Sequence, residues 1–183
     1  MTNALPIAGL LLSSVLSQAA LAGSVVTIDQ VGGGNRAVVR QTGKTNHAEI
    51  DQTGTSNRAE LLQFGDANDA QLEQQGDANN ADIQQDTGNL SQQLQAGSNN
   101  QATLTQGSDN FAVQYQFGMD NMTHLEQNGA ANQAAQTQMG NGNNLSLIQN
   151  GNGLSAELGQ TGDGKALSII QTGDEAMITI HQQ

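Results

Sequence analysis

The sequence predicts an all-β protein, a flat two-sheet β-solenoid of the cross-β amyloid type. Three observations support this prediction: Gln recurs about every 11 residues, a Gly-bearing link lies between successive Gln residues of this series, and side chains alternate in character between the links. A fixed period of this kind marks a repeat architecture, and period-two alternation bounded by turn residues indicates strands with one buried face.

The composition limits the classes of protein that the chain can belong to. Its 183 residues include 26 Gln, 19 Asn and 22 Gly, with 2% aromatic residues and no Cys, so disulfides and thiolate metal sites are excluded. Five Lys and Arg against 17 Asp and Glu give a net charge of −12, which argues against nucleic acid because phosphate affinity requires clustered cations. Composition alone also fits a disordered or aggregating chain, so the order of the residues decides.

The first 22 residues differ from the rest of the chain. A mostly apolar run over residues 5–16 is followed by Ala20-Leu21-Ala22, a pattern typical of a secretory signal peptide with its cleavage site. We therefore expect a signal peptide at 1–22 and a repeat domain at 23–183. A buried or interfacial helix is the alternative for the first segment.

Two columns of amide residues define the repeat. The Gln column recurs at intervals of 11 residues, shortened to 10 at two places, and consists of Gln30, Gln41, Gln52, Gln63, Gln74, Gln85, Gln95, Gln106, Gln116, Gln127, Gln138, Gln149, Gln160, Gln171 and Gln182. The Asn column lies six residues before the Gln column and consists of Asn35, Asn46, Asn57, Asn68, Asn79, Asn89, Asn100, Asn110, Asn121, Asn132 and Asn143. The spacing of six survives at both shortened links, so the unit is a seven-residue segment joined by a link of three or four residues.

Within each segment the side chains alternate. A small or apolar residue such as Ala48 stands two positions after the Asn column, and in most copies a large aliphatic residue such as Ile50 stands four positions after it. Of the 22 charged residues, only Lys165 falls in an inward column. Because an unpaired buried charge is costly, the Asn, small, aliphatic and Gln columns form the buried face. A right-handed coiled coil also has an 11-residue period, but a Gly in every link would weaken that helix by roughly 1 kcal/mol per repeat.

A longer period indicates two sheets. Gln93, Gln114 and Gln136 replace the aliphatic residue only in alternate segments, so alternate segments share an environment and the structural repeat is about 22 residues. We expect fifteen strands, from 24–30 to 176–182, in two sheets about 10 Å apart. In-register stacking pairs the inward amides with copies of themselves, and both ends leave strand edges open to another molecule. The Gln and Asn columns are therefore the candidate self-assembly ladder.

The repeat resembles that of a known family. Residues 24–41 read SVVTIDQVGGGNRAVVRQ and fit the curlin pattern S-x5-Q-x-G-x-x-N-x-A-x3-Q at every marked position. The chain is similar to curlins over 24–182, in about seven and a half copies. This resemblance implies a secreted structural subunit of curli, the pilus-like extracellular amyloid fibres of the bacterial cell surface, which serve in biofilm matrix and cell adhesion. It also implies polymerisation with itself and other curlin subunits, a curli secretion channel with accessory proteins, and attachment to the outer-membrane surface.

Curli contain a major subunit and a minor subunit that nucleates the fibre. The stretches 50–54 (IDQTG) and 56–59 (SNRA) resemble the nucleator, as do the last repeats, where Leu154, Lys165 and Ala176 replace Asn. The resemblance therefore favours the minor subunit. The number of repeats keeps the major subunit open, and a monomeric β-solenoid surface adhesin is the alternative from a different class.

No catalytic, cofactor-binding or metal site is expected. His47, His124 and His181 fall at outward positions at least 57 residues apart, and no helix is expected after Gly32-Gly33-Gly34, which therefore indicates a turn and not a phosphate-binding loop. The sequence thus predicts a chain that is not an enzyme and that binds no cofactor and no nucleic acid.

Overall fold

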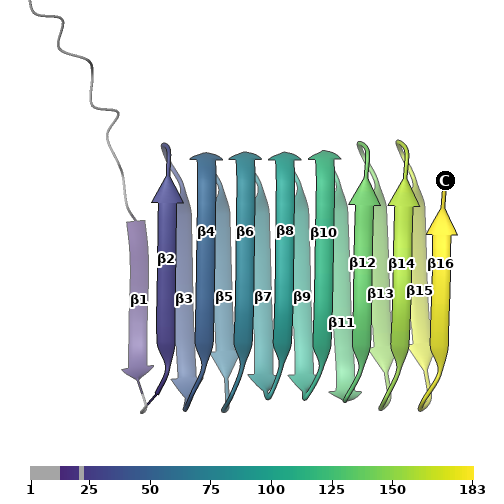
Figure 1. Ribbon diagram of the computed structural model, residues 1–183, viewed down its shortest axis with the longest axis horizontal. Helices are drawn as coiled ribbons and strands as arrows, with labels where there is room; N and C mark the ends of the chain where they lie inside the picture. Colours follow the sequence, from purple (N-terminus) through teal and green to yellow (C-terminus); the bar gives the residue numbers. More distant parts are fainter. Residues whose placement is uncertain (1–12, 21–22) are drawn as a thin grey trace, which may run out of the picture.

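The computed structural model describes residues 13–20 and 23–183, and in this part of the chain the regular structure consists of sixteen β-strands (Figure 1). The strands are β1 (Ser13–Ala20), β2 (Val25–Val31), β3 (Arg36–Gly43), β4 (His47–Thr55), β5 (Arg58–Phe64), β6 (Asp69–Asp77), β7 (Asn80–Thr87), β8 (Leu90–Ser98), β9 (Gln101–Ser108), β10 (Phe111–Met119), β11 (Met122–Ala130), β12 (Gln133–Met139), β13 (Asn144–Asn150), β14 (Ser155–Thr161), β15 (Ala166–Thr172) and β16 (Met177–Gln182).

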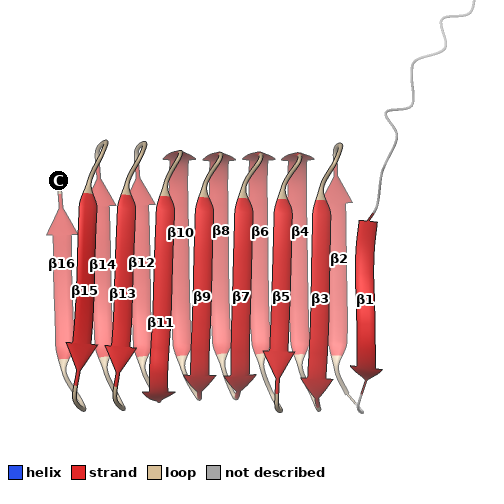
Figure 2. Ribbon diagram, turned by 180° about the vertical axis from the view of Figure 1, so that it is seen from behind, coloured by secondary structure: helices blue, strands red, loops and turns tan. Residues whose placement is uncertain are grey.

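The strands form two parallel eight-stranded sheets. The odd sheet has the order β1-β3-β5-β7-β9-β11-β13-β15, and the even sheet contains β2 to β16 in the same way. Figure 1 shows the even sheet in front and Figure 2 the odd sheet in front, with the strands of the two sheets running in opposite directions. Each strand pairs with the strand one turn away, about 22 residues along the chain. The predicted two-sheet β-solenoid is confirmed.

The fifteen predicted strands correspond to β2–β16, and β1 is an additional strand that the sequence analysis did not predict. It pairs in register with β3, so that Leu16 lies beside Val39 and Gln18 beside Gln41. This strand falls within the predicted signal peptide, where the alternative was a helix. Residues 1–12 and 21–22 of that segment lie outside the described residues, and the signal peptide itself stays a prediction.

Between the sheets lies a thin core built from the small and aliphatic columns. Ile50, Leu61 and Ile83 are fully buried, and the charged residues of 23–183 are all outside the buried set. Outward side chains are mostly exposed; Val38 is an exception at 1% exposed. The two ends differ from the middle, since Ile28 in β2 and Ile180 in β16 are only partly buried. Each strand alone covers little apolar surface, so burial depends on the strands above and below it.

The links follow a fixed backbone pattern that places the columns in register. In each link from β2 to β16, the residue just before the Asn column has a positive φ, at Gly34, Thr45, Ser56, Ala67, Ala78, Gly88, Asn99, Asp109, Asp120, Ala131, Gly142, Gly153, Gly164 and Glu175. A Gly stands two residues after most Gln residues of the column, and a side chain at this position would clash with the link of the next turn. At Gly54, with φ of 117°, an added Cβ would lie 2.0 Å from the Gly76 carbonyl oxygen in the next turn. Gly at this position therefore lets successive links approach closely.

Candidate self-assembly site

The Gln column forms an unbroken hydrogen-bonded ladder in each sheet. In every step, Nε2 of one Gln donates to Oε1 of the next Gln of the same sheet. The even sheet has seven such bonds of 2.5–3.0 Å from Gln30 to Gln182. The odd sheet has six of 2.8–2.9 Å from Gln41 to Gln171. The predicted pairing of Gln amides with copies of themselves matches this geometry.

The same amides also join the two sheets. The second Nε2–H of Gln63 in β5 donates to the carbonyl oxygen of His47 at the start of β4, at 2.8 Å. In the same way, Gln74 Nε2 in β6 donates to the carbonyl oxygen of Arg58 in β5 at 3.0 Å. A primary amide has two N–H donors, and here one serves the ladder and the other serves the opposite sheet. The buried amides are thereby satisfied, as a buried polar group requires.

Both Gln ladders run in one direction along the stack. Every amide donates toward the β15–β16 end and accepts from the β2–β3 end, because the backbone carbonyl fixes which side of the amide holds the nitrogen. At the first step of the even sheet, Gln30 Oε1 is buried and has no hydrogen-bond partner. At the other end, Gln171 Nε2 has no further Gln and donates to the carbonyl oxygens of Ser155 and Ala176, at 3.3 and 2.7 Å. One end of the stack therefore presents an unfilled acceptor, and at the other end the N–H of Gln171 that would continue the ladder binds a backbone carbonyl instead.

The Asn column is also buried, but its bonds differ from those expected. Asn57 Nδ2 donates to the carbonyl oxygen of Gly76 in the next link at 2.8 Å. Its Oδ1 accepts the backbone N–H of Asn79 at 3.0 Å. Direct amide-to-amide bonds occur at only some steps, for example from Asn68 Nδ2 to Asn46 Oδ1 at 3.2 Å. The expectation that each Asn pairs with copies of itself is therefore incomplete, because its main partners are backbone groups of the adjacent turn.

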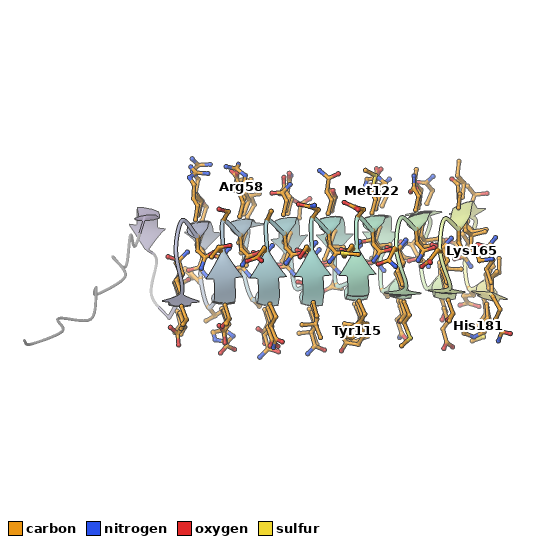
Figure 3. All side chains as sticks on the ribbon, turned by 90° about the horizontal axis from the view of Figure 1, so that it is seen from above. Arg58, Tyr115, Met122, Lys165 and His181 are labelled. Carbon is orange, nitrogen blue, oxygen red and sulfur yellow. The ribbon has the colours of Figure 1, made fainter. Side chains whose placement is uncertain are left out.

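Twenty-four of the 26 residues of the two columns are buried; Gln41 and Gln182, in the outermost strands of the ladder, are partly exposed. Where Leu154 and Lys165 replace Asn, their backbone N–H groups still donate to Asn132 and Asn143 at 2.9 Å. Lys165, the one inward charge, is half-buried. Figure 3 shows Arg58 and Met122 pointing out from one sheet and Tyr115 and His181 from the other.

A third, shorter ladder was not among the predicted site residues. Gln93, Gln114 and Gln136 stack in the even sheet, with Nε2–Oε1 distances of 2.5 and 2.9 Å. They are at most 1% exposed. Gln93 Oε1 has no partner, because the residue beside it in β6 is Leu72. In the sequence this ladder is visible as Gln in three alternate copies of the aliphatic column.

Carboxylates gather on the outer face of the even sheet. Asp29, Asp51 and Glu73 occupy one column in β2, β4 and β6. Partial burial raises the pKa of Asp51, and the negative charges of Asp29, Glu73 and Glu49 raise it further. On the odd sheet, burial raises the pKa of Asp82, with Glu60 adding to the effect and Arg58 opposing it. Both carboxyl groups are thus less favourably ionised in the folded chain than in water.

Cations are fewer and lie mainly on the odd sheet. Glu60 accepts from Arg40 at 3.3 Å and from Arg58 at 2.9 Å. His47 Nδ1 lies 2.8 Å from Asp69 Oδ1 on the even sheet. Over residues 13–20 and 23–183, no group of His, Cys, Asp and Glu is arranged to hold a metal ion. In the same ranges there is no helix of the length and apolar character needed to span a membrane.

The fold and its ladders define a structural protein, a β-solenoid whose ends remain open strand edges. A family model described as the curlin-associated repeat matches residues 24–54, 43–76 and 54–86. These matches support the curlin family for this chain, and the turns beyond residue 86 continue the same strand register and Gln ladder. No curated protein matches the sequence.

Proposed function

We propose that this chain is a secreted subunit of curli-type extracellular amyloid fibres, formed by stacking of its ends on itself and on other curlin subunits. The observation that carries the proposal is the pair of one-directional Gln ladders, of which the even-sheet ladder begins at the unfilled acceptor Gln30 Oε1. Adding another solenoid extends the two Gln ladders and buries the partly exposed Ile28 and Ile180. Fibres built this way serve in biofilm matrix and cell adhesion at the bacterial surface.

Within such a fibre we assign the chain the role of the minor, nucleating subunit. The support is its resemblance to the nucleator at 50–54 and 56–59 and in the last repeats, where the Asn column ends at Asn143. A preformed strand edge can template the folding of an added chain, because its N–H and C=O groups are already aligned. The major subunit is the second candidate, and the fifteen in-register strands from β2 to β16 favour it.

The decisive experiment follows fibre growth by thioflavin-T fluorescence and fibre diffraction, using 23–183. We expect a lag, seeded growth, and reflections near ~4.7 and ~10 Å. Trace amounts added to a major curlin should shorten its lag if the chain nucleates; an unchanged lag together with efficient self-assembly would indicate the major subunit. A stable monomer that never grows would refute the proposal and leave a monomeric adhesin.

A matched pair of variants tests whether growth uses the open edge. Ile28→Lys places a charge on the inward side of the first strand of the even sheet, where an added solenoid must pack. Thr27→Lys places the same charge on the exposed outer side, next to Glu49 in β4. We expect the first variant to abolish growth and the second to grow normally. Equal growth of the two variants would show that the fibre does not form through this edge.

A further inference from the structure

The number of strands determines how two copies of the solenoid can fit end to end. Residues 23–183 contain fifteen strands, eight in the even sheet and seven in the odd sheet. The first of these strands, β2, and the last, β16, therefore belong to the same sheet. At one end β2 is the outermost strand, and at the other end β16 extends beyond β15.

Stacking a second copy in the same orientation leaves a gap. The added β2 would pair with β16, but the odd sheet would then lack one strand between β15 and the added β3. A missing strand removes the backbone hydrogen bonds of a whole ladder step on both sides. It also leaves Gln171 without the next Gln and keeps Leu167 and Ile169, which are only partly buried, uncovered on that side.

A rotation of 180° about the stack axis removes the gap. It exchanges the two sheets, so the added β2 pairs with β15 and the added β3 pairs with β16. The strands remain parallel to their new neighbours, because odd and even strands run in opposite directions (Figures 1 and 2). The solenoid allows this exchange because both sheets carry apolar and Gln inward columns in the same order at the two ends.

The side chains at the rotated junction fit one another. In this register Leu167 and Ile169 meet Val26 and Ile28, which are all partly buried apolar residues in the single chain. Gln171 faces Gln30, whose buried Oε1 has no donor, and the Gln171 N–H that donates to the Ala176 carbonyl in the single chain can turn to this oxygen. The second pair of strands places Ile178 and Ile180 on Ala37 and Val39, and Gln182 on Gln41. The Gln ladders and the apolar columns thus continue through the junction.

One contact favours the unrotated arrangement. There, Asp29 would lie beside His181 on the outer face, whereas the rotated junction places Arg40 beside His181. Both outward positions are exposed, and exposed ion pairs contribute little to stability. A complete strand pairing in the odd sheet outweighs one such pair.

We infer that successive copies of 23–183 are rotated by 180°, so that the fibre is a two-fold screw in which each side shows the even and odd sheets alternately. The inference rests on the proposed fibre function and on removal of residues 1–22. The carboxylate column of Asp29, Asp51 and Glu73 then alternates along the fibre with the odd-sheet face that carries Arg40 and Arg58.

Disulfide cross-linking distinguishes the two orientations, since the chain has no Cys. β1 pairs only with β3, so 23–183 retains every other strand pair. In the rotated junction Thr27 lies beside Ser168, and in the unrotated junction it lies beside Thr179; all three are exposed. Neighbouring strands are about 4.8 Å apart, within the Cα separation that a disulfide spans.

We expect fibres of Thr27→Cys/Ser168→Cys, after oxidation and dissolution, to give a series of covalent multimers on a non-reducing gel. Fibres of Thr27→Cys/Thr179→Cys should dissolve to monomers. Multimers from the Thr179 pair and monomers from the Ser168 pair would overturn the inference but leave the fibre function intact. Fibres in which neither pair cross-links would have the same consequence. Single-Cys variants are the controls, because a dimer formed by either one would indicate that copies do not stack head to tail. A chain that forms no fibres would overturn the proposed function together with the inference.

A change in strand number provides an independent test. Ending the chain at residue 172 removes β16 and leaves fourteen strands, so that the unrotated stack becomes gap-free and Thr27 faces Glu157 in β14. In this background Thr27→Cys/Ser168→Cys should lose its cross-links and Thr27→Cys/Glu157→Cys should gain them. Cross-linking of the Ser168 pair at both chain lengths would show that strand number does not set the rotation.

Discussion

Replacing one Gln inside the ladder measures what the ladder contributes to stability. Gln63 is fully buried in β5, donates to Gln85 Oε1 at 2.9 Å and to the His47 carbonyl at 2.8 Å, and accepts from Gln41 Nε2 at 2.8 Å. Leu has nearly the same volume, so Gln63→Leu removes three hydrogen bonds and opens little space. Gln85 Oε1 then stays buried without a donor, while Gln41 Nε2 keeps its bond of 3.2 Å to the Val25 carbonyl.

An unsatisfied buried polar group costs about 1–3 kcal/mol. One fully buried acceptor is left without a partner and two other groups are weakened, and the greater apolar character of Leu offsets part of the loss. We expect Gln63→Leu to lower the free energy of unfolding by about 2–4 kcal/mol, measured by guanidinium denaturation. Gln84→Leu, on the exposed face of β7, is the matched control and should change stability by less than ~0.5 kcal/mol. Equal stability of the two variants would refute the structural role of the ladder.

Three further predictions concern the links and the charges. Gly54→Ala should lower the free energy of unfolding by about 3 kcal/mol or more in denaturation experiments, because Gly54 has a φ of 117° and the added Cβ would lie 2.0 Å from a backbone oxygen. Gly33→Ala is the control: Gly33 has open space around it, so this change should leave stability unaltered. Ala78→Gly should raise stability by about 0.5–1 kcal/mol, since Ala78 has a φ of 56°; a loss would show that the left-handed backbone carries no strain. The raised pKa values of Asp51 and Asp82 mean that folding favours their neutral forms, so stability should increase as the pH falls from 7 through these raised values and level off below the ordinary value of 3.8. Asp51→Asn/Asp82→Asn should therefore be more stable than the parent at pH 7, with a flatter pH profile in denaturation experiments; an unchanged profile would contradict the assignment.

Short-range patterns were sufficient for most of the fold. The alternation within segments such as 46–52 identifies which side chains are buried, because a strand turns successive residues to opposite faces. The change from Leu72 to Gln93 in alternate segments indicated two sheets, because residues stacked in one column share a chemical environment. The Gln ladder followed from the same register, since identical residues one turn apart must face each other.

Features that depend on backbone geometry could not be predicted from the residue pattern. The residue before each Asn has a positive φ, yet Thr45, Ser56, Ala67 and Glu175 share no chemistry that marks it. The Asn column was expected to pair with itself, but most of its Nδ2 atoms donate to glycine carbonyls whose position is set by the link of the next turn. β1 was also missed, because its interrupted pattern becomes a strand only beside the open edge of β3.

The sequence by itself determined the strands, their inward faces, the two-sheet stack and the residues of the Gln ladder, because all of these depend on residue spacing along the chain. Only the tertiary structure decided the direction of the ladders and the unfilled acceptor at Gln30. These properties arise from the relation between turns, where the position of one backbone carbonyl orients each amide.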